Sequence, residues 1–208
     1  GFDEVIADTV SGNYIEKLTL DGAGGFEADA VATFGLFAND GRTLRGTALN
    51  TFYSIYAVFS SAGDVTAVSN GVEFTGSAGE FKLYMDVDNN TETQYSDMSL
   101  LNTADDFLLG MSTELGANIG AAITVGGKTT TSFNFDFSGF SLTADGEDYF
   151  IAPRPFSTKI NVSGDFNNFD PTNTSGEQDP IYGEVSAQFY DVPEPSTLAV
   201  LALGLLGL

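Results

Sequence analysis

The sequence contains no cysteine, no histidine and no tryptophan, and lysine and arginine together supply only 7 of its 208 residues. Without cysteine and histidine, the chain cannot form a disulfide, a thiolate nucleophile, a typical zinc or copper centre, or a Ser-His-Asp triad. Any metal ion would have to be a hard cation held by oxygen atoms. The scarcity of basic residues also argues against nucleic acid as a partner, because binding it depends on clustered lysine and arginine.

Acidic residues, glycine and aromatic residues are abundant instead. Aspartate and glutamate number 29, which gives a formal net charge of −22, yet 42% of the residues are hydrophobic, too many for a disordered acidic segment. The 24 glycines, 18 phenylalanines and 8 tyrosines favour β structure, since aromatic side chains fill pleated surfaces and glycine suits turns. The length suits one domain with a buried core.

The stretch 131–140 is the clearest predicted strand. Phe133, Phe135 and Phe137 alternate with polar residues, so the three rings should share one buried face. The run 52–59 is aromatic on both faces, as expected for a central strand that is covered on both sides. Further strand-like runs lie at 14–20, 26–37, 71–74, 81–85, 159–164 and 181–190.

Three other stretches complete the predicted architecture. Residues 76–79 fit a hairpin connection, 105–115 fit either a short helix or a strand, and the polar stretch 167–180 should form an exposed loop. About nine to eleven strands without helix-length spacers imply an antiparallel sandwich or barrel. We predict an all-β fold: an antiparallel β-sandwich, jelly-roll-like or Ig-like, over residues 1–190, followed by a hinge and an apolar C-terminal tail over 191–208.

The composition changes abruptly after Tyr190. Two prolines stiffen a short hinge that consists of Val192, Pro193, Glu194, Pro195, Ser196 and Thr197. The last eleven residues carry no polar side chain, and their larger members are Leu198, Val200, Leu201, Leu203, Leu205, Leu206 and Leu208. This apolar run is too short to cross a bilayer, which takes about 20 helical residues.

A Pro-Glu-Pro hinge before an apolar run closely resembles the PEP-CTERM sorting signal of exported bacterial proteins. The resemblance implies recognition by the membrane protease exosortase and a cell-surface or extracellular location. In that family the apolar segment is longer and ends in a basic cluster, and neither feature is present here. Because Gly1–Glu4 is polar and acidic, we expect export by a signal peptide that has already been removed.

The body of the chain carries a second resemblance. Over residues 1–120 it is similar to the flocculation-associated PEP-CTERM proteins, through the order and spacing of 12–14, 18–20, 53–59, 74–79 and 83–86. Those proteins are extracellular and act with exopolysaccharide in bacterial aggregates, and they have no known catalytic residues. The resemblance therefore implies a structural or adhesive role in a biofilm matrix, with exopolysaccharide as a partner.

One acidic stretch has the spacing of a calcium loop. Oxygen-bearing side chains recur at Asp86, Asp88, Asn90, Glu92 and Asp97, which we take as candidate ligands of calcium. The pattern departs from an EF-hand, because Thr91 stands where glycine is required and Asp97 where the final glutamate belongs. The alternative is a solvated acidic turn. The stretch 165–170 is a second, weaker candidate.

Two further functions are open alternatives. Glycoside hydrolysis needs a pair of carboxyl groups, and Asp105-Asp106, Asp145/Glu147/Asp148 and Glu177/Asp179 provide them, but no feature distinguishes one pair, so we expect no enzyme. A carbohydrate-binding module would use exposed aromatic rings. The candidates for such rings are Tyr149, Phe150, Phe166 and Phe169.

The apolar tail also permits self-assembly. Burying each leucine is worth roughly 1.5–3 kcal/mol, so the tail offers on the order of 10 kcal/mol to whatever accepts it. The acceptor could be a bilayer, the chain's own sandwich or a neighbouring copy. The stiff hinge favours projection, and we therefore hypothesise a head-to-tail homopolymer that grows into filaments.

Overall fold

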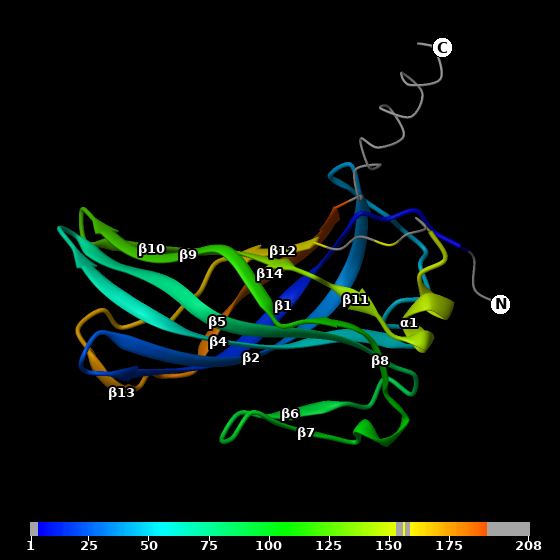
Figure 1. Cartoon of the computed structure of the whole chain (residues 1–208), viewed down its shortest axis with the longest axis horizontal. Helices are drawn as coiled ribbons and strands as arrows, with labels where there is room; N and C mark the ends of the chain where they lie inside the picture. Colours follow the sequence, from blue (N-terminus) through cyan, green and yellow to red (C-terminus); the bar gives the residue numbers. More distant parts are fainter. Residues whose placement is uncertain (1–3, 153–155, 157–158, 191–208) are drawn as a thin grey trace, which may run out of the picture.

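The computed structural model describes residues 4–152, 156 and 159–190, and almost all of its regular structure is β (Figure 1). Within these residues, no helix is long and apolar enough to span a membrane. The helical segments are a 3₁₀ turn, η1 (Thr103–Asp105), and α1 (Ala144–Tyr149). The strands are β1 (Thr9–Asp21), β2 (Gly25–Asn39), β3 (Arg42–Thr43), β4 (Ser54–Val68), β5 (Gly71–Asp86), β6 (Glu92–Gln94), β7 (Ser99–Leu101), β8 (Phe107–Ser112), β9 (Glu114–Val125), β10 (Lys128–Ser138), β11 (Ser141–Leu142), β12 (Lys159–Gly164), β13 (Ser175–Glu177) and β14 (Ile181–Tyr190).

The main sheet closes on itself. Its strands follow the order β5-β4-β2-β1-β14-β12-β10-β9, and β9 then returns to pair with the first residues of β5. The last residues of β5 pair with β8 instead, and β8 carries β11 at its far edge. Every one of these pairs is antiparallel, which confirms the predicted all-β, antiparallel fold.

Phenylalanine rings fill the space between two layers of this closed sheet. Strands β5, β4, β2 and β1 face strands β14, β12, β10 and β9. Phe137 of β10 meets Phe59 of β4 and Phe81 of β5, with ring centroids 6.4 and 5.6 Å apart. Nearer β1, Phe133 meets Tyr14 edge-on at 5.4 Å. Because each buried ring contributes roughly 1.5–3 kcal/mol, these contacts hold the layers together without disulfides.

Several predicted strands are confirmed. In β10 the three alternating rings at Phe133, Phe135 and Phe137 are all buried, and the runs at 159–164 and 181–190 coincide with β12 and β14. The stretch 105–115 forms strand rather than α-helix after η1. The first residues of β4 are buried on both faces, as the aromatic pattern predicted.

The predicted hairpin at 76–79 is wrong. Strand β5 runs unbroken from Gly71 to Asp86, and the hairpin turn lies between β4 and β5 at 69–70. Gly76 of β5 makes room for Asn118 of β9, because a Cβ at this position would lie 2.9 Å from the Asn118 amide oxygen. That amide accepts a hydrogen bond from the Gly76 N–H and donates one to the Gly76 carbonyl at 2.9 Å. A side chain therefore replaces a neighbouring strand at this point.

The prediction of an exposed loop at 167–180 is also partly wrong. The stretch contains β13, which pairs with β1, and it buries Phe169 and Gln178. The Gln178 amide accepts from the Asp170 N–H at 3.2 Å and donates to the Asn173 carbonyl at 2.9 Å. One buried amide therefore replaces the backbone hydrogen bonds that an ordered loop lacks.

We predict that Phe137→Ala lowers the free energy of unfolding by about 3–5 kcal/mol, because it leaves a cavity between the layers. Urea denaturation followed by circular dichroism measures the change. Phe52→Ala is the matched control, since Phe52 is 63% exposed, and it should cost less than about 1 kcal/mol. Equal losses in the two variants would contradict the interlayer role of Phe137.

Candidate functional site

A surface excursion carries four of the five calcium ligands predicted from the sequence, Asp88, Asn90, Glu92 and Asp97. After β5 the chain leaves the sandwich, forms the β6–β7 hairpin and η1, and returns in β8 (Figure 1). The excursion covers the outer face of β4, where Tyr56 stacks on Tyr84 of β5 with ring centroids 5.0 Å apart. Lys17 of β1 also holds it, by donating from Nζ to the Ser96 carbonyl at 3.0 Å. This cover explains why the first residues of β4 are buried on both faces.

Three carboxylates converge beneath the excursion. Asp86, Asp105 and Asp106 each place a carboxylate oxygen within 4.8 Å of the others. Asp86 is the last residue of β5 and only 1% exposed, whereas the other two are partly buried. The left-handed backbone of Asn102, with a φ of 61°, starts the tight turn that brings Asp105 and Asp106 back to the sheet. The excursion therefore begins and ends at this cluster.

Neutral donors orient two of the carboxylates. Asp86 Oδ2 accepts from Ser54 Oγ at 3.2 Å and from the Thr91 N–H at 2.8 Å. Asp106 Oδ2 accepts from the Tyr56 hydroxyl at 2.7 Å and from Thr91 Oγ1 at 2.9 Å. Burial, followed by the hydrogen bond to Asp106, raises the pKa of Tyr56 above its ordinary value, so this hydroxyl remains a donor.

Of the five ligands predicted from the sequence, only Asp86 belongs to this cluster. The side chains of Asp88, Asn90, Glu92 and Asp97 are exposed. Asp97 accepts from the side chain and the N–H of Ser99, and these hydrogen bonds lower its pKa. Alternating acids along one loop were the pattern read from the sequence, whereas the structure gathers acids from the two ends of the excursion.

The stretch 165–170 was the second candidate for calcium binding, but its carboxylates already accept hydrogen bonds from other groups of the protein. The carboxylate of Asp165 accepts from the Glu184 N–H at 2.8 Å, and Asp170 accepts from the N–H and hydroxyl of Thr172 at 2.8 and 2.7 Å. The hydrogen bonds to Thr172 lower the pKa of Asp170. Asp170 therefore caps its own turn, whereas Asp165 binds the backbone of β14, 19 residues further along the chain.

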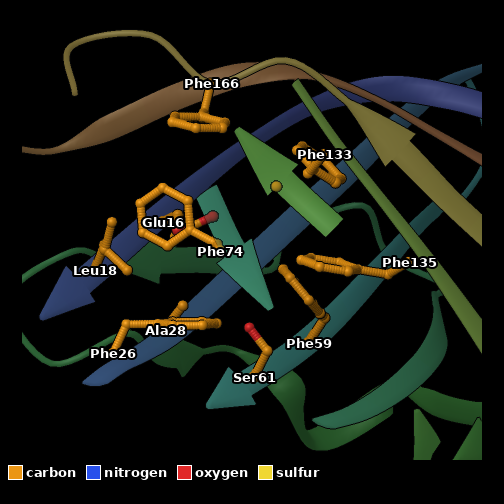
Figure 2. Close-up of a pocket in the computed structure, with 11 residues that line it drawn as sticks. Glu16, Leu18, Phe26, Ala28, Phe59, Ser61, Phe74, Phe133, Phe135 and Phe166 are labelled. Atoms are coloured by element: carbon orange, nitrogen blue, oxygen red, sulfur yellow. The ribbon is translucent and has the colours of Figure 1, made fainter. Parts of the chain in front are cut away.

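A small cavity lies in the interior between the layers (Figure 2). Its volume is about 30 Å³, enough for water but not for a sugar ring. Its polar side chains are Glu16 of β1 and Ser61 of β4, and its apolar lining includes Phe26, Phe59, Phe74, Phe133, Phe135 and Phe166. Burial, with a smaller contribution from the Asp29 carboxylate, raises the pKa of Glu16 to about 8. Glu16 is therefore largely a neutral acid at pH 7.

The predicted aromatic platform for sugars is wrong in part. Phe166 and Phe169 are 7% and 9% exposed and pack against Phe74 in the core. Tyr149 and Phe150 are partly buried, and the Tyr149 hydroxyl is hydrogen bonded to that of Tyr53 at 2.8 Å. Their rings face other aromatic rings rather than open surface.

A groove with polar side chains along part of its wall, called the polar groove below, lies on the outer face of β1 and β2. It has a volume of about 340 Å³, and its lining combines Asn13, Thr33, Asn50 and Thr93 with the apolar side chains of Ile15 and Val31. Asn13 and Thr33 lie directly opposite each other in the β1–β2 register and are both exposed. Amide and hydroxyl groups arranged in this way can exchange hydrogen bonds with sugar hydroxyls.

The C-terminal residues predicted to act in sorting and assembly, from Val192 to Leu208, lie outside the described residues. Comparison with protein families finds the PEP-CTERM protein-sorting motif at residues 191–208, which confirms the resemblance drawn from the sequence. Searches of curated proteins and of solved structures found no match. The motif implies a protein that is exported, recognised by exosortase, and located at the cell surface or outside the cell.

We predict that Glu16→Gln makes the protein more stable than the wild type at pH 8 but not at pH 5. A carboxyl whose pKa is raised by folding stabilises the folded state when protonated, and this contribution disappears as the pH rises towards about 8. The difference in free energy of unfolding between the variant and the wild type should therefore grow by about 2–4 kcal/mol.

Urea denaturation at both pH values measures this difference. Glu27→Gln, at an exposed position of β2, controls for the loss of one negative charge and should show a much smaller change. A wild type and a Glu16→Gln variant with the same pH dependence would contradict the burial of this carboxyl.

Proposed function

We propose that this chain is a structural or adhesive protein of the bacterial extracellular matrix, that it associates with exopolysaccharide, and that it is not an enzyme. The observation that carries the proposal is the PEP-CTERM motif at residues 191–208, directly after β14. A sorting signal in this position directs the preceding β-sheet domain to the outside of the cell. The likeness of residues 1–120 to flocculation-associated proteins supports a role in aggregates.

The interactions that the candidate catalytic acids make in the folded chain support a role without catalysis. Glu177 forms an ion pair with Lys17 at 3.2 Å, and Asp106 accepts two hydrogen bonds under the excursion. Glu16, whose raised pKa would suit a general acid, faces a cavity of about 30 Å³, which is too small for a glycoside.

The polar groove on β1 and β2 is the surface we propose for exopolysaccharide. It is open, and amides and hydroxyls line part of it beside the apolar Ile15 and Val31, whereas the rings that would define a carbohydrate-binding module lie in or against the core. Without ring stacking, each sugar would be held by hydrogen bonds alone and therefore weakly. Such a surface favours many weak contacts along a polysaccharide over tight binding of one defined sugar.

We predict that the full chain co-sediments with exopolysaccharide from the bacterium that produces it, and that Asn13→Ala with Thr33→Ala reduces the bound fraction at least threefold. Thr130→Ala with Asn134→Ala removes the same chemistry from the exposed face of β10 and should leave binding unchanged.

Loss of the chain from that bacterium should also reduce cell aggregation. Undiminished aggregation together with absent co-sedimentation would refute the matrix role.

We also propose that copies of the chain associate head to tail through the apolar run 198–208, and thereby form filaments. The support is compositional, because an eleven-residue run without a polar side chain gains free energy from any apolar acceptor. A heterologous contact of this kind does not close, so it extends into a fibre.

Deletion of Leu198–Leu208 should convert filaments of the full chain into monomers, as seen by negative-stain microscopy and analytical ultracentrifugation. The deletion should leave the circular dichroism spectrum of the β body unchanged. Filaments that persist without the run would refute the tail as the linking element.

A further inference from the structure

We propose that Asp86, Asp105 and Asp106 form a calcium site that fastens the two ends of the 87–106 excursion to the sandwich. This ligand set differs from the one that the sequence pattern predicted, and it shares only Asp86 with that set. The proposal does not depend on a role in the matrix.

Buried oxygens without partners are the main reason for the assignment. Asp86 Oδ1, Asp105 Oδ2 and Asp106 Oδ1 are each shielded from solvent and accept no hydrogen bond. Asp86 is 99% buried, since its exposed fraction is 1%, and its carboxylate points into the cluster. A buried carboxylate oxygen without a hydrogen bond is strongly destabilising unless a cation compensates it.

The negative charge of the three carboxylates also favours a bound cation. None of the ion pairs among the described residues joins a lysine or arginine to Asp86, Asp105 or Asp106. The donors that reach them, Ser54, Tyr56 and Thr91, are neutral. Carboxylates this close repel one another strongly at the reduced dielectric of a protein surface, and a divalent cation would turn that repulsion into attraction.

The hydrogen bonds already present match those found around metal ligands. Each of Asp86 and Asp106 uses Oδ2 for hydrogen bonds and leaves Oδ1 unpartnered. Carboxylates that bind metals are commonly oriented by hydrogen bonds of this kind from a surrounding layer of residues. Thr91 donates to both carboxylates, so the excursion itself helps to set their geometry.

The ligand chemistry favours calcium over magnesium. The three carboxylate oxygens lie within 4.8 Å of one another. Mg²⁺ demands a near-ideal octahedral set of ligands and gives up its waters reluctantly, whereas Ca²⁺ tolerates irregular sets of oxygens. Calcium also accepts incomplete sets of carboxylates completed by water and carbonyl oxygens, with the weak affinity typical of extracellular modules.

Isothermal titration of the full chain with CaCl₂ tests the site. We expect one saturable site per chain, a dissociation constant between about 10⁻⁴ and 10⁻³ M, and binding at least tenfold weaker in Asp86→Asn and in Asp106→Asn. Asp88→Asn is the matched control, because Asp88 is an exposed acid of the same excursion, and its affinity should stay within twofold of the wild type. Circular dichroism checks that each variant is folded, and Asp105→Asn replaces Asp86→Asn if the buried position does not tolerate the change.

Hydrogen exchange gives a second readout that surface binding of calcium would not produce. Calcium should slow exchange of the backbone amides in 87–106 at least fivefold in the wild type and in Asp88→Asn, but not in Asp106→Asn. Three results would overturn the site: no saturable binding, equal affinity in all the variants, or loss of binding in Asp88→Asn alone. Equal affinity for MgCl₂ would overturn the choice of calcium.

Discussion

Contact between phenylalanine rings of opposite layers is the interaction on which the rest of the structure depends. The chain has no cysteine for cross-links and only 7 basic residues for ion pairs, so burial of apolar surface must supply most of its stability. Phe59, Phe81 and Phe137 meet at the centre of the sandwich. The return of β9 to β5 closes the sheet around them, and this closure removes the long open edges at which β proteins aggregate.

Because the chain has a net charge of −22, its acidic side chains must either lie in solvent or have their charge compensated where they are buried. Most lie on the outside, where water screens them, but two places depart from this rule. Glu16 is half-buried and faces the interior cavity, where desolvation keeps it largely protonated and therefore compatible with its aromatic neighbours. Asp86, Asp105 and Asp106 gather under the excursion with three unpartnered oxygens. A proton compensates the first departure, and a bound cation, as proposed above, would compensate the second.

Alternation within a strand could be read from the sequence, whereas contacts between distant segments could not. The buried face of β10 follows from the period of two at Phe133, Phe135 and Phe137. Gly76 was mistaken for part of a turn, because its role depends on Asn118, which lies 42 residues away. The acidic cluster could not be read from the sequence for the same reason: spacing along one loop favoured Asp88 as a partner of Asp86, while closure of the excursion brought Asp106 to Asp86. The sorting motif needs no tertiary partner, and it was recognised from its residues alone.

The weak affinity expected of the acidic cluster fits the destination that the sorting motif implies. A site that binds calcium only at high concentration leaves the excursion unfastened where calcium is scarce and fastens it where calcium is abundant. Calcium at ten times its dissociation constant would stabilise the folded state by about 1.4 kcal/mol, which is a substantial fraction of the stability of a typical domain. Because Asp86 ends β5 and Asp106 precedes β8, that free energy would act on the excursion between them. The same excursion contributes Thr93 to the lining of the polar groove. Calcium that fixes the position of the excursion would therefore also change the affinity of the groove for polysaccharide.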